Sequence, residues 1–383
     1  MFHAVVSDEM RRAISWISGP HGTIQLGQHP QNYGVMAAIT TSVHRTITDV
    51  KQNEWNAIVA QQSQTGSVFE RYEWLNAYEE AVGADARHVQ VRKNGTLVGV
   101  HPAFVRSLPG TPFRFLGPAK PGTNGALIAT DEAAVFDAIA DELSTLTSGR
   151  TIGHLLRPAS SASLRYGTRL RERGYAPSLR DCQFVVDTDR PWADVESDLS
   201  QKKRRNLRKA DEAGVTATDV PVTADSIRAF SDRHTAHMDR LDGDGASPAF
   251  LRALFDRLGD RLILFRATVD GESVGELLAV CDDERDSLFL LFPAYDPTNF
   301  EHYPSEMLYR AAVSWSIDAG YATCNFGETT PDFDDGTFAF KSAFGGEPVP
   351  TVRWERLGSL AGRLLYALGS DRIVARLFPP AKR

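Results

Sequence analysis

Residues 262–281 read Leu262-Ile-Leu-Phe-Arg-Ala-Thr-Val-Asp-Gly-Glu-Ser-Val-Gly-Glu-Leu-Leu-Ala-Val-Cys281. Two apolar runs flank the pair Asp270-Gly271, and a two-residue turn of this kind between such runs is a strong signal for a β-hairpin. The same pattern occurs earlier, where Asn94-Gly95 separates the expected strands 88–93 and 97–105. We therefore expect a hairpin of long strands in each half of the chain.

The elements around the two hairpins follow the same order: helices, hairpin, a further strand, a helix and a strand. In the first half we expect helices 51–60, 72–82, 131–146 and 160–174, and strands 113–116, 125–129 and 151–155. In the second half we expect helices 194–213, 224–238, 248–258 and 305–319, and strands 183–187, 287–293 and 323–326. This order predicts an α/β (α+β) fold with two tandem units, each a mixed sheet flanked by helices.

The chain of 383 residues is too long for one ordinary core. We expect a poorly ordered extension over 1–35, a first domain over 36–180 and a second over 181–350. Residues 351–383 form a basic segment that we expect to return to the first domain. From position 353 on it contains seven Arg or Lys and two acidic residues, so peripheral contact with anionic lipid is the alternative.

Composition excludes several classes of protein. No run of 18 apolar residues occurs, so we expect no membrane span and a cytoplasmic location. Cys182, Cys281 and Cys324 have the spacing of neither a disulfide framework nor a zinc site. His234 and His237 lack a third ligand, so no metal site is expected. The net charge of −7 argues against general coating of nucleic acid, and no oligomeric state is indicated. Neither a nucleophile-elbow motif nor a P-loop occurs.

Lys341 is unusual in its setting. The chain has eight lysines against 34 arginines, and Lys341 is the only lysine between Ala210 and Pro380. It lies among aromatic residues, where an ammonium is costly unless an anion meets it. We interpret it as a candidate catalytic residue. The alternative is a lysine whose charge reaches water from the end of an amphipathic element.

A basic segment is the second candidate site. Six of the eight residues 202–209 are basic, at the start of a helix that Ser200 could cap. A helix N-terminus with adjacent Arg and Lys suits a phosphate group. A solvated helix face is the alternative.

The motifs resemble one known family. They are Lys202-Lys-Arg-Arg-Asn-Leu-Arg-Lys-Ala210, the segment from Tyr309 to Gly327, Gly336-Thr-Phe-Ala-Phe-Lys-Ser-Ala-Phe-Gly345 and Val68-Phe-Glu-Arg-Tyr-Glu-Trp74. Together with the duplicated element order, they are similar over about 45–355 to the FemAB-related, BioF2-like acetyltransferase-domain proteins. These are relatives of the Fem peptidyltransferases in the GNAT superfamily. The resemblance implies two tandem GNAT-like domains with a cleft between them, and transfer of an acyl or aminoacyl group to an amine.

The resemblance also implies roles for single residues. Lys341 would stabilise charge near the reacting carbonyl, and Arg204, with Lys202 and Asn206 beside it, would hold a phosphate-bearing substrate. Tyr303 and Phe340 complete the candidate substrate-binding set. In the acidic loop before Lys341, Glu328 and Asp332 could orient the lysine or act as acid or base. A solvated acidic loop is the alternative.

The acyl donor is expected to be either acyl-CoA or aminoacyl-tRNA, with no tightly bound cofactor. Residues 296–304 stand where GNAT enzymes have a glycine-rich loop for CoA phosphates, but they include two acids and no glycine. This favours aminoacyl-tRNA. We expect an acceptor amine on a phosphorylated, nucleotide-linked or lipid-linked precursor of the cell envelope. The alternatives are a CoA-dependent N-acetyltransferase and a non-catalytic module that binds tRNA or a membrane.

Overall fold

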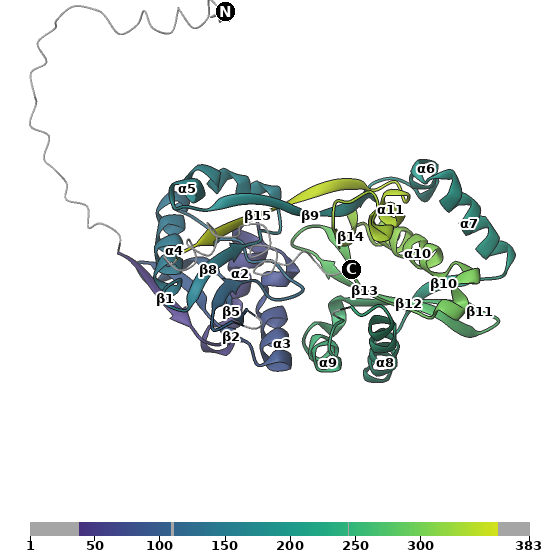
Figure 1. The fold of residues 1–383 in the computed structure, drawn as a ribbon, viewed down its shortest axis with the longest axis horizontal. Helices are drawn as coiled ribbons and strands as arrows, with labels where there is room; N and C mark the ends of the chain where they lie inside the picture. Colours follow the sequence, from purple (N-terminus) through teal and green to yellow (C-terminus); the bar gives the residue numbers. More distant parts are fainter. Residues whose placement is uncertain (1–37, 109–110, 244, 359–383) are drawn as a thin grey trace, which may run out of the picture. The chain divides into compact units, whose positions relative to one another are not determined.

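The computed structural model describes residues 38–108, 111–243 and 245–358 (Figure 1). In these ranges the strands form two sheets. One has four strands in the order β1-β3-β4-β7, and the other has eleven in the order β10-β11-β12-β13-β14-β9-β15-β8-β6-β5-β2. The expectation for residues 1–35, and that for the basic stretch from 359 onward, lie outside the described residues.

The regular elements divide between the two halves of the chain. The first half contains β1 (Ile39–His44), α2 (Gln52–Ala57), α3 (Tyr72–Val82), β2 (Asp85–Ala86), β3 (His88–Lys93), β4 (Thr96–His101), β5 (Phe104–Ser107), β6 (Arg114–Gly117), β7 (Leu127–Ile128), α4 (Glu132–Leu146), β8 (Thr151–Leu156) and α5 (Gly167–Glu172). The second half contains β9 (Ala176–Asp187), α6 (Trp192–Asp198), α7 (Gln201–Glu212), β10 (Thr216–Val220), α8 (Ala224–Arg240), α9 (Pro248–Leu258), β11 (Leu262–Val269), β12 (Glu272–Asp282), β13 (Ser287–Tyr295), α10 (Pro304–Ala319), β14 (Thr323–Thr329), α11 (Gly336–Ser342) and β15 (Glu347–Leu357). Among the described helices, none combines the length and the apolar character needed to cross a bilayer.

Both predicted hairpins are present. β3 pairs antiparallel with β4, and β11 pairs antiparallel with β12. Their turns have positive φ at both central residues, with 50° at Asn94, 83° at Gly95, 51° at Asp270 and 84° at Gly271. This conformation matches the twist of the flanking strands and is tolerated by Asn, Asp and Gly.

Several predicted elements were wrong in their extent, and for two of them the cause is local. The strand expected over 97–105 is divided into β4 and β5, which belong to different sheets, because Pro102 between them has no N–H to donate to a ladder. The helix expected over 194–213 is divided into α6 and α7. Ser200 between them is extended, with ψ of 151°, and its hydroxyl accepts the N–H of Lys203, as predicted for a helix cap.

Strands β9 and β15 connect the two halves through one sheet. β15 pairs with β9 along most of its length, and its last residues, Trp354–Leu357, pair with β8 of the first half. β9 pairs on its other side with β14 of the second half. Figure 1 shows β9 in teal and β15 in yellow running side by side. The larger sheet is therefore continuous across both halves.

The hydrophobic core also crosses the boundary between the halves. Trp55, Trp74 and Phe104 of the first half lie in one buried cluster with Phe230 and Phe250 of the second. The rings of Trp74 and Phe250 meet edge to face, with centroids 5.7 Å apart. Because each large aromatic side chain buries about 150–250 Å², this contact between α3 and α9 stabilises the pairing of the halves.

Candidate active site

The site forms where two parallel strands separate. β13 and β14 pair only over Ser287–Phe289 and Thr323–Asn325. Beyond that point β13 has a bulge, since Leu278 faces Phe292 and Ala279 faces Leu290 and no residue faces Leu291. A bulge of this kind bends the strand and redirects the extra residue. The register of β14 with β9 also shifts beyond Asn325. From this point β13 and β14 diverge.

Two cavities lie along this opening and share Leu291. The helix-side cavity, about 450 Å³, is lined by residues of α8, β13, α10 and α11, including His234, Tyr309 and Phe340. The junction cavity, about 160 Å³, is lined by residues of both halves, including Phe69, Arg157, Gln183 and Lys341. The two cavities therefore adjoin at the β13 bulge.

Lys341 lines the junction cavity from the short helix α11. Asp335 caps this helix by accepting the N–H groups of Thr337 and Phe338 at 2.8 and 3.0 Å. The Lys341 residue is only 5% exposed, and its Nζ donates to the carbonyl oxygens of Gly327 (3.1 Å) and Glu328 (3.0 Å). The alternative of a lysine that reaches water is therefore wrong.

Burial sets the protonation behaviour of Lys341. It lowers the pKa of the ammonium to about 8, although the nearby groups Cys182 and Asp335 favour the charged form. The lysine therefore still carries its proton at pH 7, and its pKa lies near the pH at which most enzymes are active. An ammonium has three N–H donors, of which two are bonded to the carbonyl oxygens.

The two acidic candidates have different surroundings. The Glu328 carboxylate forms an ion pair with Arg157, and both side chains are largely buried at the junction cavity. The Asp332 carboxylate accepts the N–H of Asp334 at 3.0 Å within the turn before α11, and Asp332 lines neither cavity. Sequence reasoning missed Arg157, because nothing in its own segment indicates that it meets a residue of β14.

In the basic segment, Lys203 rather than Lys202 is directed inward. Lys203 is 6% exposed, and its Nζ lies 2.9 Å from Oε1 of Glu306 and 3.4 Å from the centre of the Phe340 ring. Asn206 donates to the same Glu306 oxygen at 2.9 Å. Burial would raise the pKa of Glu306, but Lys203 and Asn206 outweigh it and hold that pKa below its usual value.

The remaining candidates of this region lie apart from that network. Lys202 and Arg204 are exposed, and Nη1 of Arg204 donates to the carbonyl oxygen of Ser197 at 2.8 Å. Tyr303 adopts a left-handed conformation, with φ of 52°, immediately before α10. The structure therefore places Asn206 and Phe340 at the Lys203–Glu306 pair and leaves Lys202 and Arg204 facing solvent.

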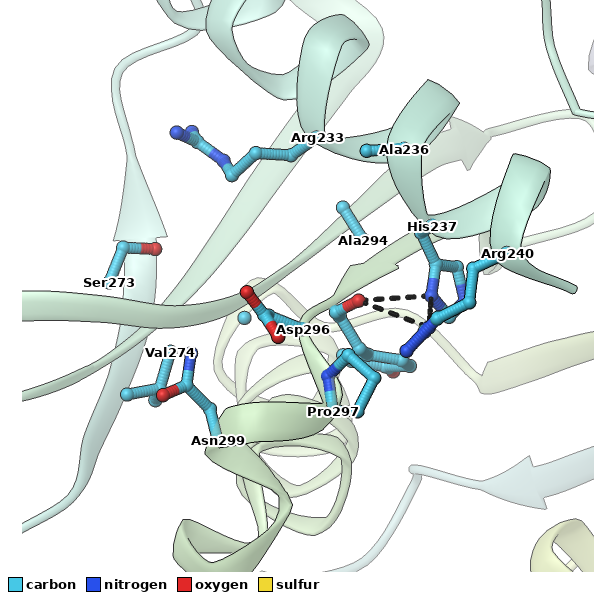
Figure 2. A pocket seen from close by; sticks show the side chains of 12 residues that line it. Arg233, Ala236, His237, Arg240, Ser273, Val274, Ala294, Asp296, Pro297 and Asn299 are labelled. Carbon is cyan, nitrogen blue, oxygen red and sulfur yellow. Dashed lines mark hydrogen bonds between the residues drawn. The ribbon is translucent and has the colours of Figure 1, made fainter.

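A third cavity, of about 330 Å³, borders the segment that follows β13 (Figure 2). Its walls include Arg233, His237 and Arg240 of α8 and Asp296 at the start of the segment, and it shares His237 with the helix-side cavity. Nδ1 of His237 lies 3.0 Å from the carbonyl oxygen of Tyr295.

The segment itself is a 3₁₀ helix over Pro297–His302, and its first N–H groups are already used. The Asp296 carboxylate accepts from the backbone N–H of Thr298 at 2.9 Å and from its hydroxyl at 2.7 Å. These bonds lower the pKa of Asp296, so a negative charge stays at this position.

Comparisons with known proteins agree with this geometry. Residues 197–342 match the family described as acetyltransferase (GNAT) domain. Among solved structures, the chain is similar to FemX, with 13% identity over 84% of this chain and 99% of that one and a TM-score of 0.65. A tandem GNAT protein from the clavulanic acid biosynthesis pathway has 13% identity over 84% and 99%, with a TM-score of 0.53. L-PGS from Bacillus licheniformis has 13% identity over 87% and 98%, also with a TM-score of 0.53. No curated protein matches the chain in sequence.

These matches define a protein with the tandem GNAT fold and a GNAT-type acyltransferase domain in its second half. The predicted fold class is confirmed, and the resemblance to FemAB-related GNAT proteins is confirmed at the level of the fold.

Proposed function

We propose that the protein transfers an aminoacyl group from aminoacyl-tRNA onto an amine, with Lys341 at the reacting carbonyl. The observation that carries the proposal is the Nζ of Lys341, which is buried at the junction cavity where β13 and β14 separate and which, among the described residues, donates to two carbonyl oxygens. Its third N–H is the donor that a carbonyl oxygen entering this cavity would meet.

In the proposed step the amine nitrogen attacks the ester carbonyl carbon. The new C–N bond forms as the carbonyl electron pair moves to oxygen, and Lys341 donates a hydrogen bond to that oxyanion. The C–O bond to the tRNA ribose then breaks, and the proton lost by the amine goes to the leaving oxygen. A single donor at a developing oxyanion contributes about 10²–10³ in turnover.

The carboxylate of Asp296 supports aminoacyl-tRNA over acyl-CoA as the donor. A helix N-terminus with free N–H groups attracts a diphosphate. Here Asp296 already occupies the N–H group of Thr298, and the buried carboxylate of Glu306 lies in the first turn of α10. A diphosphate at this position would meet the charge of Asp296 and would find the Thr298 N–H already bonded, whereas the charge of Glu306 is already balanced by Lys203. A tRNA donor would also place the reaction in the cytoplasm.

For the acceptor, we propose an amine on a phosphorylated, nucleotide-linked or lipid-linked cell-envelope precursor. The exposed side chains of Lys202 and Arg204, at the start of α7, are available to a phosphate group. One similar structure is named as a domain of a putative lysylphosphatidylglycerol synthetase from Agrobacterium fabrum, with a TM-score of 0.53 and 13% identity over 84% of this chain and 96% of that one. Contact of residues 353–383 with anionic lipid belongs to this proposal.

The test follows radiolabel from the donor to the acceptor. The full chain is incubated with an envelope-precursor fraction and either [¹⁴C]aminoacyl-tRNA or [¹⁴C]acetyl-CoA, next to Lys341→Met. We expect transfer from aminoacyl-tRNA by the unaltered protein and its loss in the variant. Transfer from acetyl-CoA alone would favour the CoA-dependent alternative, and tRNA binding without any transfer would favour the non-catalytic one.

A further inference from the structure

A fourth cavity adjoins the junction cavity and has a polar lining. It has a volume of about 230 Å³ and shares Phe69, Thr123, Gln183 and Phe289 with the junction cavity. Six of its lining residues carry a hydroxyl group, so we call it the hydroxyl cavity. Its hydroxyl-bearing lining residues are Ser67, Thr123, Ser160, Ser161, Ser287 and Thr323. A molecule whose amine reaches Lys341 can therefore extend into this second space.

Asp282, at the end of β12, lines the hydroxyl cavity and is 3% exposed. Its Oδ1 accepts the N–H of Val68 at 2.8 Å. Arg285 also lines the cavity, but it is exposed and its Nη1 donates to the carbonyl oxygen of Gln64 at 3.5 Å, and no cation among the described residues forms an ion pair with the Asp282 carboxylate. The neighbouring acid Glu284, by contrast, is paired with Arg71 and Arg261. A buried carboxylate without a cation is costly for a folded protein, so this position points to a ligand that supplies the cation.

The groups around Asp282 increase that cost. Burial raises its pKa well above the usual value, and the negative charges of Glu284 and Glu70 raise it further, while Arg285 opposes them. Glu70 is itself buried and has a pKa raised to about 7 by burial. An added positive charge at this end of the cavity would therefore stabilise two carboxylates.

Ser287 provides a second, independent observation. It faces Asp282 across the β12–β13 ladder, and residues directly opposite in a ladder project their side chains from the same face of the sheet. Ser287 is 6% exposed, it lines the same cavity, and its hydroxyl oxygen has no hydrogen-bond partner among the described residues. A carboxylate without a cation and a hydroxyl without a partner thus stand next to each other on one wall.

We propose that the hydroxyl cavity binds a second ammonium group of the acceptor, which is therefore a diamine or a compound that contains a diamine unit. This inference rests on the proposed function in so far as the first amine reacts beside Lys341. The second ammonium donates to the Asp282 carboxylate and to the Ser287 hydroxyl. The phenyl rings of Phe69 and Phe289 at the shared wall suit the methylene chain that joins the two nitrogens.

The test measures binding, without any transfer. The full chain is titrated calorimetrically with 1,5-diaminopentane and with n-pentylamine, which has the same carbon chain and one nitrogen. We expect the diamine to bind about tenfold more tightly or better. Asp282→Asn keeps an acceptor for the Val68 N–H but removes the charge, so the two amines should then bind alike. Asp283→Asn is the matched control, because the carboxylate of Asp283 accepts from Tyr321 and does not line the cavity.

Thermal melts of Asp282→Asn at two pH values provide a second test, which does not depend on ligand binding. If the carboxylate of Asp282 is buried without a cation, Asp282→Asn melts at a higher temperature than the unaltered protein at about pH 8 and gains nothing at about pH 4, where the carboxyl is protonated. Equal binding of the two amines by the unaltered protein, or a diamine preference that persists in Asp282→Asn, would overturn the inference. A diamine preference without transfer from any donor would keep the cavity assignment and remove the proposed function.

Discussion

The ammonium of Lys203 lies over the ring of Phe340, the residue that precedes Lys341. Glu306 of α10 holds the same ammonium, and the backbone N–H of Ser200 donates to the carbonyl oxygen of Ala343 at 2.9 Å. α11 has only seven residues, and a helix this short depends on its neighbours for stability. The basic segment of α7 thus supports the helix that carries Lys341.

Loss of the Lys203 side chain should destabilise the protein strongly. In Lys203→Ala the carboxylate of Glu306 stays buried without its cation, and breaking a buried pair in this way costs about 3–5 kcal/mol. Urea denaturation measures the change. Lys202→Ala, at the exposed neighbouring position, is the control and should remain within about 0.5 kcal/mol of the unaltered protein. A similar loss in both variants would mean that the Lys203–Glu306 pair does not stabilise α7 against α10.

Lys341→Met should abolish most of the transfer and leave the fold intact. Removing one donor to an oxyanion lowers turnover by about 10²–10³, and methionine fills a similar volume without a charge. Transfer of labelled aminoacyl groups measures the first effect, and circular dichroism measures the second. Turnover equal to that of the unaltered protein would exclude Lys341 from the reaction.

The pH dependence of turnover should separate two roles for Lys341. The pKa of its ammonium is about 8. If the charged form stabilises the oxyanion, turnover falls as the pH rises through about 8. If the neutral amine acts as a base, turnover rises over the same range. We expect the fall, measured as transfer rate between about pH 6 and 9.5.

The lowered pKa of Lys341 also predicts an effect on the stability of the folded protein. Its buried ammonium destabilises the fold, whereas a lysine in an ordinary ion pair stabilises it. The folded pKa of about 8 is below the usual lysine value of 10.5, so between these two values the unfolded chain binds more protons and this group adds stability as pH rises. Lys341→Met should therefore be more stable than the unaltered protein below about pH 8, and the difference should shrink towards pH 10.5. Thermal melts across this range measure it. A difference that does not change with pH would contradict the depressed pKa.

Arg204→Ala should raise KM for the phosphate-bearing substrate more than it lowers kcat. Arg204 is exposed and has no carboxylate partner among the described residues, so its charge is available to a phosphate. The control is Arg228→Ala, an exposed arginine of α8 that pairs with Asp225. Steady-state kinetics with varied substrate distinguish the two parameters. If KM is unchanged in Arg204→Ala, the exposed face of α7 does not contribute to substrate binding.

A glycine after α11 offers a test of close packing. Gly345 has a φ of 75°, and a Cβ there would lie 2.8 Å from Cβ of Asp198 and 3.1 Å from its carbonyl oxygen. Gly271, with a φ of 84°, has open space at the same position. Both Gly→Ala variants strain the backbone by about 1–2 kcal/mol, and Gly345→Ala should lose clearly more stability in urea because it also displaces α6. Equal losses would mean that the contact with Asp198 relaxes without cost.

Local sequence signals predicted the parts of the fold that local chemistry determines. The Asn94-Gly95 and Asp270-Gly271 turns, the cap at Ser200 and the duplicated order of elements are all present. The long pairing of β9 with β15 was missed, because strands whose partner lies about 170 residues away leave no local signal of their register.

The site was predictable to a similar extent. The scarcity of lysine singled out Lys341, and the structure buries it at a cavity. In the basic segment, Lys203 shares a helix face with Leu207 and Ala210, which indicates a docking side, but its partner Glu306 was not identified because that contact depends on the tertiary structure. Asp282 and Ser287 gave no signal either, because their importance comes from burial without a partner, which depends on the tertiary structure.

The continuity of the sheet through β15 constrains how the chain folds as it is synthesised. β8 pairs with β6 on one side, but the partner of its other side is complete only when Trp354–Leu357 have been made, about 200 residues after β8 itself. At a synthesis rate of about 5–20 residues per second, this edge of the first half stays open for roughly 10–40 s. During that interval it presents unpaired backbone groups to other chains. A nascent chain that stalls or is truncated before Leu357 would therefore be at risk of aggregation, even though all of the first half has already been translated.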